Sequence, residues 1–201
     1  PEAPAWAGPL LVGIALVLSL ASTDWMMSLD PRIASSLFPF LFAAGAFVAV
    51  FSGLAFLMSR TGIEPDLLAD FGKLLFASLC FWGYIELGHL LIVWTGNLPH
   101  EATWYLSRVE HGWKPFTVAL FFLHLGIPFF LLLSRPLKEA PRFLGAIAGG
   151  VFLVHYLEVF WMTAPRDGLP LRFDPFDPLL FLGIGWAWVH FFRRHLRKEA
   201  A

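Results

Sequence analysis

The chain has 201 residues, of which 58% are hydrophobic and only 14% are charged, and its formal net charge is −1. Soluble domains carry about a quarter charged residues, so this composition excludes an ordinary soluble domain and indicates an integral membrane protein. The nearly balanced charge gives no reason to expect a nucleic-acid partner. The single cysteine, Cys80, excludes an internal disulfide, and the sequence has no Cys-x-x-Cys-His motif for covalent haem.

Long apolar runs, separated by short connections that contain proline, predict an all-α membrane protein. We expect a polytopic bundle of about six transmembrane helices in a single domain over residues 1–201, with neighbouring helices antiparallel because the connections are short. The predicted spans are Pro9–Leu29, Ser36–Met58, Phe71–Trp94, Pro115–Ser134, Phe143–Thr163 and Pro178–Phe192.

Lysine and arginine are more frequent in the connections on the side of the membrane where the first span begins. Examples are Arg60, Arg135 and Arg142. The positive-inside rule therefore predicts that both termini are cytoplasmic. No basic segment precedes the first apolar run, so this run is not expected to be a signal peptide. Because the sequence starts at Pro1, we expect it to be part of a longer polypeptide.

Six ionisable residues of interest lie inside four of the predicted spans. A charged side chain at the centre of a membrane helix costs about 2.5–3.5 kcal/mol on insertion scales, so such residues usually line a water-filled path, a proton relay or a ligand site. They are Asp24, Glu86, His89, His124, His155 and Glu158.

The spacing of these residues predicts a proton path. Glu86 and His89 are three residues apart, as are His155 and Glu158, so each pair shares one helix face. A buried carboxyl group and an imidazole can exchange a proton near neutral pH. We therefore predict that all six residues line one path, with Asp24 nearest its outer mouth. The alternative is that each pair is a static tie between helices.

Metal and haem sites were weighed against this path. Glu-x-x-His is half of the ferritin-like di-iron pattern, but the other spans supply no further central glutamate. We therefore expect no metal and no cofactor bound by this chain alone. Histidines lie on three spans, so ligation of haem b by two of them stays open. A secondary transporter would need inverted repeats, and none is evident.

Other residues are interpreted structurally. Gly145 and Gly149 predict a face for close helix packing, and Asp70 is interpreted as the N-cap of the third span. The longest connection, Asn97–Lys114, is predicted to contain a short helix along the membrane surface and to be the docking surface for an external partner.

Several motifs resemble a known family. Residues 22–31, STDWMMSLDP, resemble the S-x-D-W-x-M-S-L-[DE]-P signature of a membrane subunit of bacterial alternative complex III. Residues 71–76 (FGKLLF), 81–84 (FWGY), 94–101 (WTGNLPHE) and 155–158 (HYLE) resemble later blocks of the same subunit, as do His124, Pro128, Ser134 and Arg135. The resemblance is to the second quinone-binding-type subunit, which is related to the NrfD-like polysulfide reductase anchors.

This resemblance implies a role in quinol:cytochrome c oxidoreduction in the bacterial cytoplasmic (inner) membrane. The implied partners are membrane lipid, a paralogous quinol-binding membrane subunit, and periplasmic iron–sulfur and haem c subunits. The implied quinone is menaquinone or ubiquinone, and the subunit itself holds no haem or iron–sulfur cluster. Members of the family have about ten spans, so the chain is expected to be the C-terminal part of such a subunit.

One position departs from the family pattern. Where a Ser-Gln pair is expected in the third span, the sequence has Gly88 and His89, preceded by Glu86. The roles of individual residues in the family are therefore not carried over to these positions. Two other functions also stay open. The chain could be a redox-silent anchor that docks periplasmic electron-transfer subunits through Asn97–Lys114, or a haem b electron-transfer protein.

Overall fold

The computed structural model describes residues 6–30, 35–165, 170–172 and 174–199, and every regular element in these ranges is helical. Five helices are long and apolar enough to cross a membrane, which confirms the prediction of an all-α, multi-pass membrane protein. They are Ala7–Leu29, Phe38–Met58, Pro65–Gly96, Trp113–Leu133 and Pro141–Thr163.

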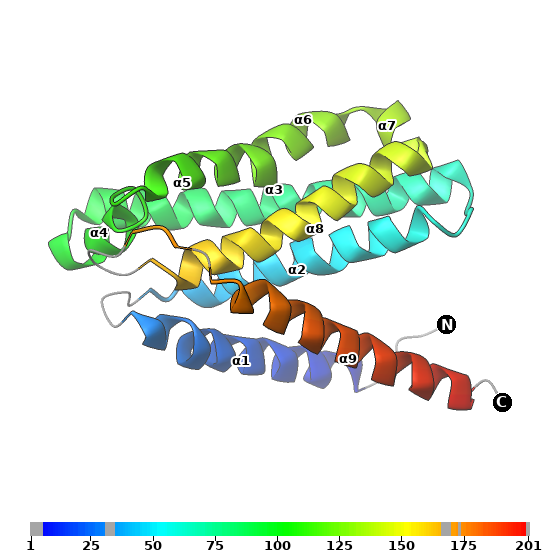
Figure 1. Cartoon of the computed structure of the whole chain (residues 1–201), viewed down its shortest axis with the longest axis horizontal. Coiled ribbons are helices and arrows are strands. Elements are labelled where there is room, and N and C mark those ends of the chain that lie inside the picture. Colours follow the sequence, from blue (N-terminus) through cyan, green and yellow to red (C-terminus); the bar gives the residue numbers. More distant parts are fainter. Residues whose placement is uncertain (1–5, 31–34, 166–169, 173, 200–201) are drawn as a thin grey trace. The chain divides into compact units, whose positions relative to one another are not determined.

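The chain divides into two compact units, Pro1–Leu169 and Pro170–Ala201. The first unit contains ten helical elements in its described part (Figure 1). In chain order these are α1 (Ala7–Trp25), η1 (Met27–Leu29), α2 (Phe38–Met58), α3 (Pro65–Gly96), α4 (Pro99–Leu106), α5 (Trp113–Phe121), η2 (Phe122–Gly126), α6 (Ile127–Leu133), α7 (Arg135–Glu139) and α8 (Pro141–Thr163).

The second unit contains α9 (Phe176–Glu199). The predicted sixth span, Pro178–Phe192, lies within this helix, which is not among the five candidate spans. The sixth crossing, the cytoplasmic location of both termini and the single domain over residues 1–201 therefore stay predictions.

Helix α3 is the longest element, with 32 residues. It begins at Pro65, whose fixed φ suits the first helical position, and ends at Gly96, where Asn97 takes a left-handed conformation with φ 48°. The interpretation of Asp70 as an N-cap is therefore wrong. Asp70 lies inside the helix, and its carboxylate is 2.8 Å from Lys73 Nζ. At 1.5 Å per residue, α3 is about 48 Å long and exceeds the hydrocarbon thickness.

The fourth span is a single helix with a π-helical turn in its middle. Within this turn the amide of Ile127 bonds the carbonyl of Phe122, five residues earlier. Pro128 follows, and it has no N–H to donate to the carbonyl of His124, four residues before it. The regular hydrogen-bond ladder is thus interrupted at His124. Such turns often mark functional positions.

Helices α2, α3 and α8 form the centre of the first unit, and the span α5–η2–α6 packs beside α3 and α8 (Figure 1). The predicted packing face on α8 is confirmed. A Cβ atom added at Gly145 would lie 2.6 Å from Ser59 Oγ, and one added at Gly149 would lie 3.1 Å from the Phe56 ring. The two glycines therefore let α8 approach α2 closely.

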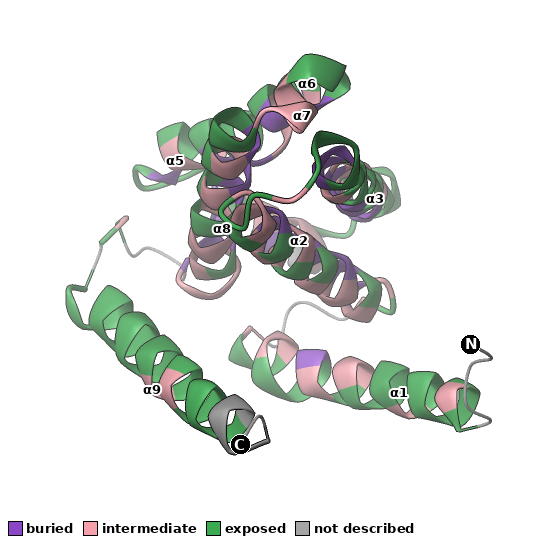
Figure 2. Cartoon of the chain, turned by 90° about the vertical axis from the view of Figure 1, so that its right-hand side faces the viewer, coloured by how far each residue is buried: buried purple, intermediate pink, exposed green. Residues whose placement is uncertain are grey.

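Many large apolar side chains of the spans are exposed, as a bilayer requires. Exposed residues are coloured green along the helices in Figure 2. Helix α1 is the extreme case, because only 6% of its apolar window is buried inside the chain. The largest buried polar side chains are those of His89, Arg108, His124 and Glu158, and these belong to the site described next.

The α2–α8 contact gives a matched pair of variants. We expect Gly145→Ala to lower the free energy of unfolding by about 1–3 kcal/mol, because the new methyl group overlaps Ser59. Gly150→Ala on the same helix meets no atom within 4 Å and should leave stability unchanged or slightly raised. Unfolding in mixed detergent micelles measures both, and equal stability of the two variants would contradict this packing.

Candidate functional site

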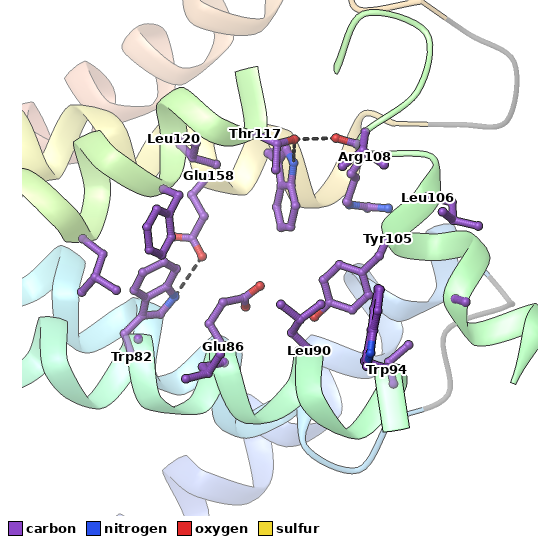
Figure 3. A pocket seen from close by; sticks show the side chains of 18 of the residues that line it. Trp82, Glu86, Leu90, Trp94, Tyr105, Leu106, Arg108, Thr117, Leu120 and Glu158 are labelled. Atoms are coloured by element: carbon purple, nitrogen blue, oxygen red, sulfur yellow. Dashed lines mark hydrogen bonds between the residues drawn. The ribbon is translucent and has the colours of Figure 1, made fainter. Parts of the chain in front are cut away.

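The carboxylate of Glu158 lies at the centre of a buried polar cluster. It is 3% exposed, and both of its oxygens have partners from the chain. Trp82 Nε1 of α3 donates to Oε1 at 2.9 Å (Figure 3). His155 Nδ1 is 2.7 Å from Oε2. His124 Nδ1 is 3.5 Å from the same Oε2. The cluster thus joins α3, α8 and the π-helical turn of the fourth span.

The sequence positions His155 and Glu158 in two ways. Their spacing of three residues places both on one face of α8. On the facing helix α2, Gly45 leaves room for the imidazole, because a Cβ atom there would lie 2.9 Å from His155 Cε1. A larger residue than glycine at position 45 would displace the His155 ring.

His124 is fully buried beside these two residues. Its ring centroid lies 4.4 Å from that of Trp82 and 5.5 Å from that of His155. Neither ring nitrogen has a hydrogen-bond partner among the residues that the structure describes. A buried polar group without a partner costs about 1–3 kcal/mol, so a ligand or a proton that the described residues do not supply would stabilise this imidazole.

A cavity of about 1090 Å³ adjoins the cluster. Its walls come from α3, α4, α5 and α8 and are mostly apolar. The carboxylates of Glu86 and Glu158 point into it from opposite sides (Figure 3). The polar side chains of Tyr105 and Arg108 line its other end. The cavity is large enough for an organic ring or a chain of water molecules.

His89 lies one turn beyond Glu86 on α3 and pairs with Tyr105 of α4. The phenol oxygen is 2.6 Å from His89 Nδ1. Burial raises the pKa of the Tyr105 hydroxyl, and the charge of Glu86 raises it further, while Arg108 acts in the opposite direction. The phenol therefore stays protonated and can donate its hydrogen to His89 when Nδ1 carries no proton.

Arg108 holds this end of the site together. Its guanidinium is buried and lies 3.5 Å from the centroid of the Trp104 ring. Nη1 donates to the carbonyl of Trp104 at 2.7 Å, and Nη2 donates to the carbonyl of Met162 at 2.6 Å. The connection that contains α4 is thereby fastened to the end of α8. The predicted short helix exists, and its Trp104 packs into the protein with 2% exposure.

The structure brings together five of the six predicted path residues in two groups. His124, His155 and Glu158 form the cluster, Glu86 faces the same cavity, and His89 follows through Tyr105. Asp24 does not join them: it is exposed near the end of α1 and is not among the residues that line the cavity.

Sequence reasoning missed three residues that matter here. Trp82 was assigned no role, although it lies four residues before Glu86 on one helix face and its indole is a donor only. Tyr105 and Arg108 were placed only in a connecting loop. The sequence WYLSR places an arginine close to two aromatic residues. This pattern could have predicted a cation that packs on aromatic rings.

The arrangement is suited to proton exchange. Glu158 is hydrogen-bonded to His155 and lies 3.5 Å from His124 Nδ1, so a small movement of the His124 ring would let the carboxylate exchange a proton with either imidazole. The histidines and the carboxylate also offer ligand atoms for a metal.

A scan against protein-family models finds none that matches the chain, and a search of curated proteins finds no similar protein.

The role of Arg108 can be tested by a conservative substitution. Arg108→Lys cannot bridge both carbonyls and stack on Trp104, so we expect it to lower the free energy of unfolding by about 1–3 kcal/mol. Hydrogen exchange should increase in residues 99–109. Arg135→Lys is the control, because Arg135 is exposed and pairs with Glu139 and Asp66 at the surface. Equal stability of both variants would show that Arg108 does not fasten α4.

Proposed function

We propose that the chain is a membrane subunit of a quinol:cytochrome c oxidoreductase of the alternative complex III type, in which it provides a proton path and a scaffold and contacts quinone. The observation that carries this proposal is the Glu158 cluster, in which a buried carboxylate meets two histidines beside a large cavity. The motifs in residues 22–31 and 71–101 support the choice of family.

The first step of the proposed path is exchange between His155 and Glu158. Their 2.7 Å contact is short enough for direct proton transfer. Trp82 donates to the other carboxylate oxygen and cannot accept a proton there, so it fixes the orientation of Glu158 without competing for its proton.

The second step crosses the cavity. Glu86 and Glu158 face the same space, which has room for water molecules that would link the two carboxyl groups. Beyond Glu86, Tyr105 and His89 continue the polar side chains towards the α4 end. The proposed path therefore runs from the cluster between the spans to the connection that contains α4.

The cavity also supports contact with a quinone such as menaquinone or ubiquinone. Its walls are largely apolar and aromatic, with a few polar groups at defined places, which is the usual character of a site for an organic cofactor. Oxidation of a quinol releases two electrons and two protons. Glu86 and Glu158 would accept the protons, and the electrons would pass to the iron–sulfur and haem c subunits of the assembly.

One observation favours a second role as an anchor. Arg108 and Trp104 fasten the connection between α3 and α5 to the bundle, so this surface is held in a defined shape. An ordered connection of this kind is suited to docking periplasmic subunits. The two roles are compatible, and the next experiment separates them.

The proton-path role predicts a loss of turnover without a loss of assembly. Glu158→Gln and Glu86→Gln keep the side-chain shape but remove the ionisable group, so each should lower quinol-dependent cytochrome c reduction by the assembled complex about 10²-fold or more, as loss of a proton-transfer group does. Glu64→Gln, at an exposed glutamate just before α3 and outside the Asn97–Lys114 connection, is the control and should retain full activity.

Subunit composition after purification is measured alongside turnover. Intact assembly with lost turnover supports the proton path. Intact assembly with normal turnover in both cavity variants would reduce the chain to an anchor and contradict the proposed path.

A further inference from the structure

The proposed proton path does not explain why the His124 ring is buried with both nitrogens unpaired among the described residues. The ring is fully buried, and neither of its nitrogens has a hydrogen-bond partner in the described part of the chain. A neutral imidazole carries one donor and one acceptor, so both are left unsatisfied in an environment where this is costly. The polar side chains of Glu158 and His155 lie beside the ring.

We propose that His124, His155 and Glu158 form a binding site for a divalent transition-metal ion, with Zn²⁺ as the best match. One ligand atom from each residue lies within 4.8 Å of the other two. Ligand atoms around a tetrahedral Zn²⁺ are about 3.3 Å apart, given bonds of about 2.0–2.1 Å. The separations of Glu158 Oε2 from His124 Nδ1 and His155 Nδ1 are 3.5 and 2.7 Å, on either side of this value.

The surroundings hold the three ligands in a fixed orientation. Trp82 Nε1 bonds Glu158 Oε1 and leaves Oε2 facing the imidazoles, which is the role of an outer-shell partner in metal sites. Gly45 leaves space for the His155 ring, and the interrupted helix at Phe122–Gly126 carries His124. The site is thus built on three packed helices and not on a mobile surface.

The cavity supplies an entry path and an open coordination position. Glu158 and Trp82 are part of the cavity wall, so an ion that enters the cavity meets the carboxylate first, and the two imidazoles lie behind it. Three protein ligands leave the fourth position of a tetrahedral ion for water. Glu86 faces the same space, and together with Glu158 it provides two carboxylates to balance a charge of +2.

The donor set decides the class of metal. Two imidazoles and one carboxylate suit Zn²⁺, Co²⁺ and Fe²⁺, whereas Mg²⁺ and Ca²⁺ prefer oxygen ligands alone. Binding requires both imidazoles to be free of a proton at the ligand nitrogen, so the metal replaces the proton between His155 and Glu158. This inference does not depend on the proposed quinol chemistry, because it follows from the three ligands alone.

Binding of Co²⁺ tests the site, since its visible absorption reports low-coordinate nitrogen and oxygen ligation. The full chain, purified in detergent with a tag that lacks histidine, should bind one Co²⁺ with such a spectrum. Zn²⁺ should displace it, and Mg²⁺ should not. His124→Gln and His155→Gln should each weaken binding at least tenfold, while His111→Gln, an exposed histidine in the connection before α5, should bind as the unaltered chain does.

A second readout covers the case in which a variant is unstable. Zn²⁺ should raise the unfolding temperature of the unaltered chain and of His111→Gln, but not that of His124→Gln or His155→Gln, because only a bound ion stabilises the folded state. Failure to bind Co²⁺, or equal binding by both triad variants and the unaltered chain, would overturn the proposal. Binding that is lost only in His111→Gln would identify surface binding and would also overturn it.

Discussion

The rest of the site depends on the contacts that the buried carboxylate of Glu158 makes with its neighbours. A buried carboxylate in a membrane span is costly unless both of its oxygens are hydrogen-bonded. The chain meets this requirement with Trp82 from α3 and His155 from α8 itself, and it places His124 within 3.5 Å. The same contacts fix how three spans pack around it. The side chains that are proposed to exchange protons are therefore also the side chains that hold the three spans together.

At the α4 end of the bundle, a buried cation is likewise stabilised by partners from the chain. Arg108 is buried, and carbonyl groups of Trp104 and Met162 accept hydrogen bonds from its guanidinium. Aromatic rings stack on it, so a charge that would otherwise be costly becomes a clamp between α4 and α8. This clamp closes one end of the cavity into which Glu86 points. His124 differs, since neither of its ring nitrogens has a hydrogen-bond partner among the described residues.

The sequence predicted what depends on spacing and hydropathy. The first five spans and the pairing of His155 with Glu158 follow from apolar runs and from the three-residue periodicity of a helix face. Contacts between distant helices were beyond it: no local pattern links Trp82 to Glu158 or Tyr105 to His89. Asp70 was misread because Pro65 starts the helix a turn and a half earlier. Asp24 was included because its segment is apolar, yet its side chain is exposed.

A double-mutant cycle between Trp82→Phe and Glu158→Met tests the central interaction most directly. The four proteins are unfolded in mixed micelles, and the coupling energy isolates the contact between the two side chains. A hydrogen bond from the indole to a buried carboxylate predicts a coupling of about 1.5–3 kcal/mol. Effects that add to within about 0.5 kcal/mol would show that the two residues do not interact, and would contradict this account of the site.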